Sequence, residues 1–137
     1  MLDLKLIRNQ PNEIAENCRN RNVDVDIEKL LMLDEQVRQI NTEIDSIREK
    51  RNAISRKIKS DISIMDRNPL IEESKILREE ESNKEKIFRE LIDQRLVLHK
   101  MVPNLTHPDS PKGFSDEDNL SIKEVGIRPE FDFEPKD

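Results

Sequence analysis

The chain has 137 residues, of which 39% are charged and 34% hydrophobic, with neither tryptophan nor tyrosine; this excludes a thick globular core and favours long helices that meet along narrow apolar lines. The net charge of −6 disfavours general binding to nucleic acid, so any such site has to be a local basic patch. The single cysteine, the absence of a signal-type apolar core and the lack of a ~20-residue apolar run predict a cytoplasmic protein without a membrane span.

Two short helices are predicted at the start of the chain, over residues 3–8 and 11–20. Pro11 suits the first turn of the second one, where its missing N–H costs nothing. Asp24 and Asp26 are candidate N-caps for the helix that follows. We expect the two short helices to pack against the base of that longer structure.

A long helix is predicted over residues 27–62, because its apolar residues recur in steps that alternate between three and four. Such spacing, 3.5 on average, keeps one narrow line of apolar side chains, here called the seam, on one side of the helix, as in coiled coils. Only Arg51 breaks the seam. Its apolar members are Leu30, Leu33, Val37, Ile40, Ile44, Ile47, Ile54 and Ile58.

A second long helix is predicted over residues 69–101, with Asn68 as its cap and Pro69 in its first turn. Its periodic apolar residues are Leu70, Leu77, Phe88, Leu91, Leu98 and Val102. Two helices joined by so short a turn must run antiparallel. We therefore expect an all-α fold: a long antiparallel two-helix coiled-coil hairpin, with the short helices packed at its base and an irregular C-terminal tail.

The register of the hairpin is predicted by the position of its turn. If the turn centres near residues 65–67, facing residues have numbers that sum to about 132, as expected for side chains that share a seam layer. Ile44 then faces Phe88, and Arg51 faces Glu81, a polar break in the second helix. Opposite charges at these two breaks are consistent with one another, and we expect Arg51 and Glu81 to be in contact.

The character of the chain changes after Val102. Residues 103–137 hold five prolines, both glycines and nine acidic against four basic side chains. Val125, Ile127, Phe131 and Phe133 hint at a short extended piece, but nothing there closes a core. We therefore divide the chain into a helical-hairpin domain, residues 1–102, and a linker, residues 103–137, that leads toward a domain which this sequence does not contain.

The strongest charge asymmetry lies on the distal half of the first long helix, where basic residues surround Asn52 and Ser55. A basic stripe on a rigid rod suits contacts to phosphates, and the lack of aromatic side chains favours a folded RNA read by shape over an unpaired strand. A solvated helix face is an equally weighted interpretation. The candidate binding residues are Arg48, Lys50, Arg51, Asn52, Ser55, Arg56, Lys57 and Lys59, with Lys75 and Arg78 from the returning helix.

No catalytic or metal site is predicted. Cys18, His99 and His107 are too few and too scattered for a zinc site. We interpret Cys18 as a core residue, His99 as a residue on the hairpin flank and His107 as part of a structural loop. With two glycines, neither in a phosphate-binding pattern, a nucleotide-binding loop is excluded.

Several short segments occur in an informative order: Met1-Leu2-Asp3, Leu6-Ile7-Arg8-Asn9, Val23-Asp24-Val25-Asp26, Arg51-Asn52-Ala53-Ile54-Ser55-Arg56-Lys57-Ile58, Pro103-Asn104-Leu105, Pro111-x-Gly113, Glu117-Asp118-Asn119, Gly126 and the final stretch from Phe131 to Asp137. In this order and spacing they resemble the N-terminal arm of bacterial-type seryl-tRNA synthetases over the whole chain. The segment from Arg51 to Ile58 matches that family's Arg-Asn-x-x-Ser-Lys-x-Ile stretch.

The resemblance implies a tRNA-binding arm that reaches across a synthetase homodimer and grips the long variable arm of serine tRNA through backbone contacts. It carries a nucleic-acid-binding role to Arg51, Asn52, Ser55, Arg56 and Lys57. The family joins serine to tRNA with ATP and Mg²⁺ in a class II catalytic domain, so these cofactors are implied for the parent enzyme and none for this chain. The tip of the hairpin, residues 61–68, is not basic: it holds Asp61 and Asp66 but only one cationic residue, Arg67.

A second interpretation stays open. The hairpin alone is also typical of a coiled-coil module that binds another protein, such as a synthetase paralogue without tRNA binding. The basic stripe and the match from Arg51 to Lys57 favour the RNA-binding arm.

Overall fold

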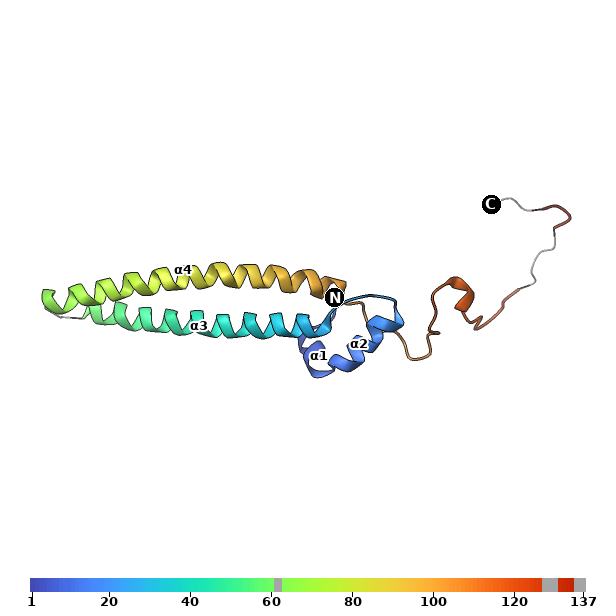
Figure 1. Ribbon diagram of the computed structural model, residues 1–137, viewed down its shortest axis with the longest axis horizontal. Helices are drawn as coiled ribbons and strands as arrows, with labels where there is room; N and C mark the ends of the chain where they lie inside the picture. The colour runs from blue at the N-terminus through green and yellow to red at the C-terminus, as the bar shows by residue number, and fades with distance from the viewer. Residues whose placement is uncertain (61–62, 127–130, 135–137) are drawn as a thin grey trace.

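The computed structural model describes residues 1–60, 63–126 and 131–134, and these residues form helices, turns and extended segments without a strand. The elements are α1 (Leu4–Asn9), α2 (Pro11–Asn20), α3 (Ile27–Lys59), α4 (Ile64–Met101) and a short 3-10 turn, η1 (Asp116–Asp118). Figure 1 shows α3 and α4 side by side as a long antiparallel hairpin, with α1 and α2 at its base. At 1.5 Å per residue, the 33 residues of α3 make an arm of about 50 Å. The all-α hairpin prediction is confirmed.

Side chains and proline mark the starts of the first three helices as local chemistry requires. The Asp3 carboxylate accepts the Lys5 N–H at 2.8 Å at the start of α1, and Pro11 occupies the first turn of α2. Of the two candidate caps for α3, Asp26 is the one used: its carboxylate accepts the Lys29 N–H at 2.8 Å. These contacts satisfy amide donors that have no partner within their own helix.

The hairpin turn differs from its prediction. α3 ends at Lys59 instead of residue 62, and α4 begins at Ile64 instead of residue 69; residues 61–62 lie outside the described part of the chain. The Ser63 hydroxyl caps α4 by accepting the Asp66 N–H at 3.3 Å while donating to the Asp66 carboxylate at 2.8 Å. This reciprocal pair supplies a start signal upstream of Asn68. Pro69 lies inside α4, beyond its first turn, so it provides no N–H for the helical hydrogen bond to the Met65 carbonyl.

The seam of α3 is buried as predicted, with Ile40 and Ile58 half-buried and the other apolar members below 9% exposed. On α4 the seam continues from Leu70 to Val102 in alternating steps of four and three, but its apolar members there are mostly half-buried. The gaps in the predicted pattern are filled by polar residues, namely Ser74, Glu81, Lys84 and Arg95. Lys84 and Arg95 reach acidic partners on α3, with nitrogen–oxygen distances of 2.7 Å to Glu43 and 2.8 Å to Asp34. The hairpin therefore combines an apolar seam from α3 with a mixed seam from α4.

The predicted register is confirmed. The guanidinium of Arg51 donates to the Glu81 carboxylate across the seam. Ile44 and Phe88 line the same groove, so they also occupy facing positions. These pairs lie seven residues, or two helical turns, apart on α3, so one register holds between them.

A small apolar core closes the base of the hairpin. It consists of Ile7, Ile14, Cys18, Ile27, Leu30 and Val102, so helices α1, α2 and α3 and the end of α4 all contribute. Cys18 is 2% exposed, which confirms it as a core residue, and burial raises the pKa of its thiol. The prediction for His99 was wrong: the side chain is buried, and its Nε2 lies 2.6 Å from the Leu2 carbonyl oxygen. The N-terminal segment covers His99 because that ring offers a donor for an otherwise unpaired carbonyl.

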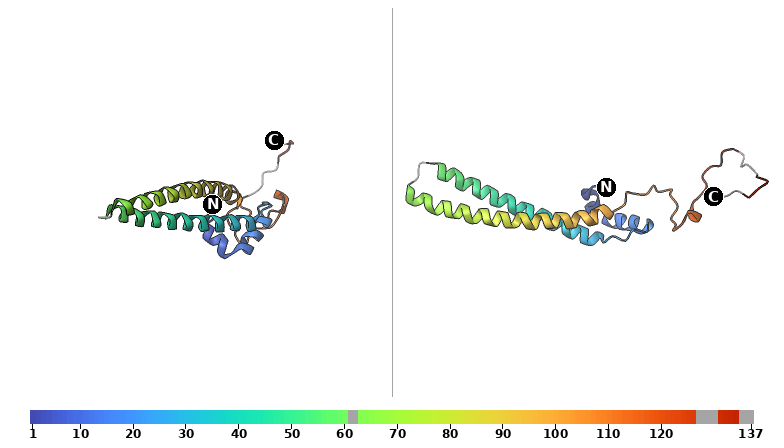
Figure 2. Two further views of the ribbon diagram at one scale, coloured as in Figure 1. Left: turned by 60° about the vertical axis from the view of Figure 1, so that its left-hand side comes forward. Right: turned by 90° about the horizontal axis from the view of Figure 1, so that it is seen from above.

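The described part of the tail leaves the base and extends away from the hairpin tip, as the views in Figures 1 and 2 agree. Val125, Phe131 and Phe133 are exposed and belong to no strand, and Ile127 of the hinted extended piece lies outside the described residues. Among the described residues, no helix combines the length and apolarity needed to cross a membrane.

Candidate nucleic-acid interface

The basic run from Arg48 to Lys59 is continuous in sequence, but the turn of α3 distributes its side chains around the helix. At 3.6 residues per turn, residues seven apart lie on the same side. The seam therefore leaves two flanks of the hairpin on which exposed side chains of α3 and α4 meet. We call them the Arg78 flank and the Glu80 flank, after a residue of α4 on each.

The Arg78 flank gathers most of the predicted binding residues. One of its grooves is lined by Arg51, Arg78, Glu81, Ser82 and Glu85, and the next by Asn41, Ile44, Arg48, Glu85, Phe88 and Arg89. Asn52, Ser55 and Lys59 follow Arg48 on α3 by one, two and three turns, so they extend this flank toward the tip. Lys75 lies one turn before Arg78 on α4, where it pairs with Glu72 at 2.7 Å.

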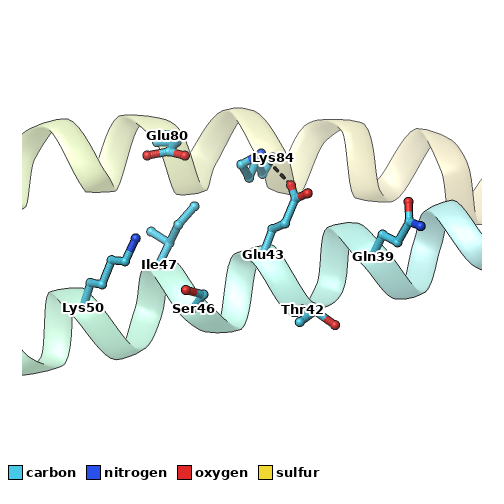
Figure 3. Close-up of a pocket in the computed structure, with 8 residues that line it drawn as sticks. All are labelled: Gln39, Thr42, Glu43, Ser46, Ile47, Lys50, Glu80 and Lys84. Carbon is cyan, nitrogen blue, oxygen red and sulfur yellow. Dashed lines mark hydrogen bonds and ion pairs between the residues drawn. The ribbon is translucent and has the colours of Figure 1, made fainter.

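The Glu80 flank holds Lys50 and, two turns later, Lys57. Figure 3 shows the groove of about 550 Å³ on this flank, with Lys50 at one end and the ion pair between Lys84 and Glu43 near its middle. Its other lining residues are Gln39, Thr42, Ser46, Ile47 and Glu80. Because Glu43 and Glu80 both face this groove, the flank carries mixed charge. Lys50 and Lys57 are thus separated from the other candidates by the width of the hairpin.

Besides Lys75, two of the predicted cations are already paired with carboxylates. Arg48 donates from Nε to Glu81 at 2.8 Å and from Nη2 to Glu85 at 2.7 Å, and Arg51 donates to the other oxygen of Glu81. The Glu81 side chain is 11% exposed. The hydrogen bond from Arg48, followed by that from Arg51, holds the pKa of Glu81 below its ordinary value, so this carboxylate stays ionised. The positive charge of Arg48 and Arg51 is therefore largely compensated inside the protein.

Apart from Lys75, the remaining cations have no ion pair within the described residues, and all of them except Lys50 lie nearer the tip than Arg51. Arg56 lies on the outward face of α3, away from α4, and its Nε donates to the Asn52 carbonyl at 3.4 Å. Lys57, Lys59 and Arg78 are exposed and belong to none of the salt bridges between described residues, and the same is true of Lys50. We call Arg56, Lys57, Lys59 and Arg78 the distal cations. They are the charges available to an incoming anion.

This arrangement suits electrostatic contact with a phosphate backbone. Long cationic side chains on a rigid rod give affinity and orientation, and the polar Asn52 and Ser55 beside them offer hydrogen bonds to phosphate or ribose. The described residues contain no group of three or more His, Cys, Asp or Glu side chains suited to a metal ion. His107 is exposed and its Nδ1 accepts the Asp109 N–H at 3.2 Å, as in a local turn.

Sequence reasoning predicted Glu81 as the partner of Arg51 but missed Glu85, the second carboxylate that compensates Arg48. Glu85 lies one turn from Glu81 on α4, and the register rule alone could have placed it beside Arg48. It also missed Asp34, which is 1% exposed and receives hydrogen bonds from Arg8 and Arg95. A carboxylate directly beside the seam residue Leu33 was the signal in the sequence, because a charge at that position needs a partner.

Comparison with known proteins gives a consistent result. A sequence model described as the seryl-tRNA synthetase N-terminal domain matches residues 1–106. The chain is 37% identical over 137 residues to the serine–tRNA ligase of Borrelia garinii subsp. bavariensis, and 34% identical over 140 residues to that of Treponema denticola. It is 33% identical over 138 residues to the serine–tRNA ligase of Rubrobacter xylanophilus. In each case the match covers 100% of this chain and 32% of the relative, so the chain spans about a third of the length of these relatives.

Proposed function

Because the chain belongs to the seryl-tRNA synthetase N-terminal domain family, we propose that it is the tRNA-binding arm of a serine–tRNA ligase. In this proposal the hairpin grips the long variable arm of serine tRNA, so that a separate catalytic domain attaches serine. ATP and Mg²⁺ serve that reaction in a cytoplasmic, homodimeric parent enzyme, and no residue of this chain is assigned to them.

The observation that carries the proposal is the division between paired and available charge along the hairpin. Near its middle, Glu81 and Glu85 compensate Arg48 and Arg51. Toward the tip, the distal cations are exposed and have no ion pair with a described residue. A rod of net acidic composition with free cations at one end contacts a polyanion there and is repelled elsewhere. This favours weak, localised binding to an RNA feature that protrudes from the rest of the molecule.

The chemistry of the distal cations indicates recognition by shape. Two lysines and two arginines act on phosphate oxygens irrespective of base identity. The described part of the hairpin has only one Phe, Tyr or Trp side chain, Phe88. This residue is half-buried in the seam and lies farther from the tip than the distal cations. Stacking on unpaired bases is therefore not available there, whereas a double-helical arm presents its phosphates at regular spacing.

The test is a salt titration of binding between the whole chain and two versions of serine tRNA, one intact and one with the variable arm deleted. We expect weaker binding to the arm-deleted tRNA. If about four phosphates are neutralised, the logarithm of affinity falls against the logarithm of salt concentration with a slope of roughly −3 to −4 for the intact tRNA. Changing Arg56, Lys59 and Arg78 together to Ala should flatten this slope by roughly 2 to 3.

A matched control removes the same charge elsewhere: Lys29, Lys86 and Lys100 changed together to Ala. These lysines are exposed on α3 and α4 and lie outside the distal cations. Helicity by circular dichroism should be retained in both triple variants, since Ala favours helix. Equal affinity for the two tRNAs would contradict recognition of the variable arm. Equal losses in the two triple variants would contradict the distal site and favour a hairpin that binds another protein.

A further inference from the structure

The chain leaving the hairpin is attached to α2 by the side chain of Asn17. Asn17 is 8% exposed, although it carries an amide and lies on a short surface helix. Its Nδ2 donates to the Asn104 carbonyl oxygen at 3.2 Å, and its Oδ1 accepts the Thr106 N–H at 2.9 Å. The nitrogen and the oxygen of one side-chain amide thus bond to Asn104 and Thr106, which lie two positions apart in the segment that leaves the hairpin.

This pattern reproduces what a neighbouring β-strand offers. In a parallel ladder, one residue donates its N–H to a carbonyl and accepts an N–H from residues two apart in the facing strand. In the described structure no strand pairs with the segment from residue 103 to 112. The Asn17 amide supplies the two hydrogen bonds that such a strand would make. The side-chain amides of Asn and Gln are suited to this, because one planar group carries both an acceptor oxygen and a donor nitrogen. An aspartate at this position would place an oxygen against the Asn104 carbonyl.

Further contacts continue the attachment along the same segment. Arg21 donates to the Asn104 carbonyl at 3.0 Å, and Lys112 lies 3.4 Å from the Glu16 carboxylate. Asn22, with its left-handed φ of 54°, donates from Nδ2 to the Gly113 carbonyl at 3.3 Å. Upstream, Val102 belongs to the apolar core. The segment between Val102 and Gly113 is therefore held against α2 at several points, and Asn17 is the only one of these polar side chains that is buried.

The turn that follows is itself tightly closed. A Cβ atom on Gly113 would lie 2.1 Å from the Cβ of Asp118, so this close approach requires glycine. The Asp118 carboxylate accepts the N–H groups of Phe114 at 2.8 Å and Ser115 at 3.2 Å, and these bonds hold its pKa below the ordinary value. The attachment to α2 thus continues into a compact turn rather than a free end.

We propose that Asn17 is a positioning residue: by holding Asn104 and Thr106 against α2, it sets the direction in which the chain leaves the hairpin. The angle between the arm and whatever follows residue 106 then depends on this contact. The contact itself is independent of the proposed function. Its importance rests on that function, because an arm that presents tRNA to a distant site has to point in one direction.

The test measures the distance between a spin label at Glu49→Cys on α3 and another at Ser110→Cys in the attached segment. Both positions are exposed, whereas Cys18 is 2% exposed and is not expected to take the label. The parent pair should give one narrow distance distribution by pulsed electron paramagnetic resonance. Asn17→Asp should broaden it, and the exchange of the Thr106 amide hydrogen should accelerate roughly five- to tenfold. Asn12→Asp adds the same charge at an exposed site on the same helix and should change neither quantity.

A second variant keeps α2 intact. Thr106→Pro removes the N–H that Asn17 accepts, and it too should broaden the distribution, while leaving the apolar core untouched. Circular dichroism checks that each variant is folded. If Asn17→Asp does not fold, the distance distribution of Thr106→Pro tests the proposal instead. An unchanged distribution in a folded variant overturns the proposal. None of these measurements uses RNA, so loss of the proposed tRNA binding and loss of this positioning role are distinguished.

Discussion

Arg8 of α1 donates a 2.7 Å hydrogen bond to the carboxylate of Asp34 on α3, and this contact ties the first helix of the chain to the hairpin. The other carboxylate oxygen accepts from Arg95 of α4 at 2.8 Å, and Arg38 approaches at 3.3 Å. Because the Asp34 side chain is 2% exposed, three helices are held together by one dehydrated charge. Such a charge is stable only while its partners remain.

Replacing Asp34 by Ala should lower the free energy of unfolding by roughly 2–4 kcal/mol, because Arg8 and Arg95 lose their partner in a partly buried site. The measurement is urea denaturation followed by circular dichroism. Glu35→Ala is the control, since this neighbour is exposed and its carboxylate contacts Arg38 and Gln39 on its own helix; it should cost less than about 0.5 kcal/mol. Similar losses in the two variants would show that the Asp34 cluster adds little.

Stability should decline in acid. Burial tends to raise the pKa of Asp34, but hydrogen bonds from Arg8 and Arg95 outweigh it and hold this pKa below its ordinary value; the pKa of Glu81 is lowered as well. The unfolded chain therefore binds more protons, so this contribution is complete above about pH 5 and is lost as the pH falls below about 4. Unfolding free energies measured from pH 7 to pH 3 should show this decline, with a shallower one in Asp34→Asn. A variant as acid-sensitive as the parent would contradict the assignment to Asp34.

The polar layer of Arg51 and Glu81 should reduce stability relative to an apolar layer. The Nε atom of Arg51 is buried and has no hydrogen-bond partner among the described residues, so the pair is incompletely satisfied. Glu81→Leu alone should destabilise by roughly 1–3 kcal/mol because Arg51 loses its carboxylate. Arg51→Leu with Glu81→Leu should recover this loss or exceed the parent, as seam positions accept Leu. A double variant less stable than both single ones, in thermal unfolding, would refute this account.

The two flanks should differ in RNA binding. Lys59→Glu with Arg78→Glu changes the Arg78 flank, and Lys50→Glu with Lys57→Glu changes the Glu80 flank by the same net charge. We expect the first pair to weaken binding to serine tRNA more, since Asn52 and Ser55 share that flank and extend the contact. Affinities measured at one salt concentration compare the pairs directly. A larger loss from the Glu80 flank would place the RNA on the other side.

The chain by itself should not activate serine. Its described residues show exposed cations and shallow grooves on a hairpin and no metal-binding cluster, and such a surface positions a polyanion without enclosing a nucleotide. Serine-dependent exchange of pyrophosphate into ATP should stay at the level of a blank. Exchange that rises in proportion to the concentration of the purified chain would refute this expectation.

The sequence by itself determined the helices and their pairing. The 3.5-residue spacing from Leu30 to Ile58 is a local signal, and the short turn forces the helices to run antiparallel. The contact of Arg51 with Glu81 was predicted from a turn at residues 65–67; it forms although the turn lies between Lys59 and Ile64, because the polar breaks of the two seams face each other. The turn itself was misplaced, because Asn68-Pro69 is a strong start signal in isolation. The Ser63 cap competes with it and is used.

Only the tertiary structure decided which charges are available and where the chain leaves the hairpin. Whether a cation is paired depends on carboxylates far along the chain: Glu85 lies 37 residues from Arg48 and reaches it only once α3 and α4 are aligned, which a pattern read along one helix does not show. Likewise, the Asn17 amide can bond to Asn104 and Thr106 only after α2 has packed on the base of the hairpin. Periodicity records which side of a helix is apolar. Ion pairs and amide bridges depend on how distant segments approach one another, which is settled by packing.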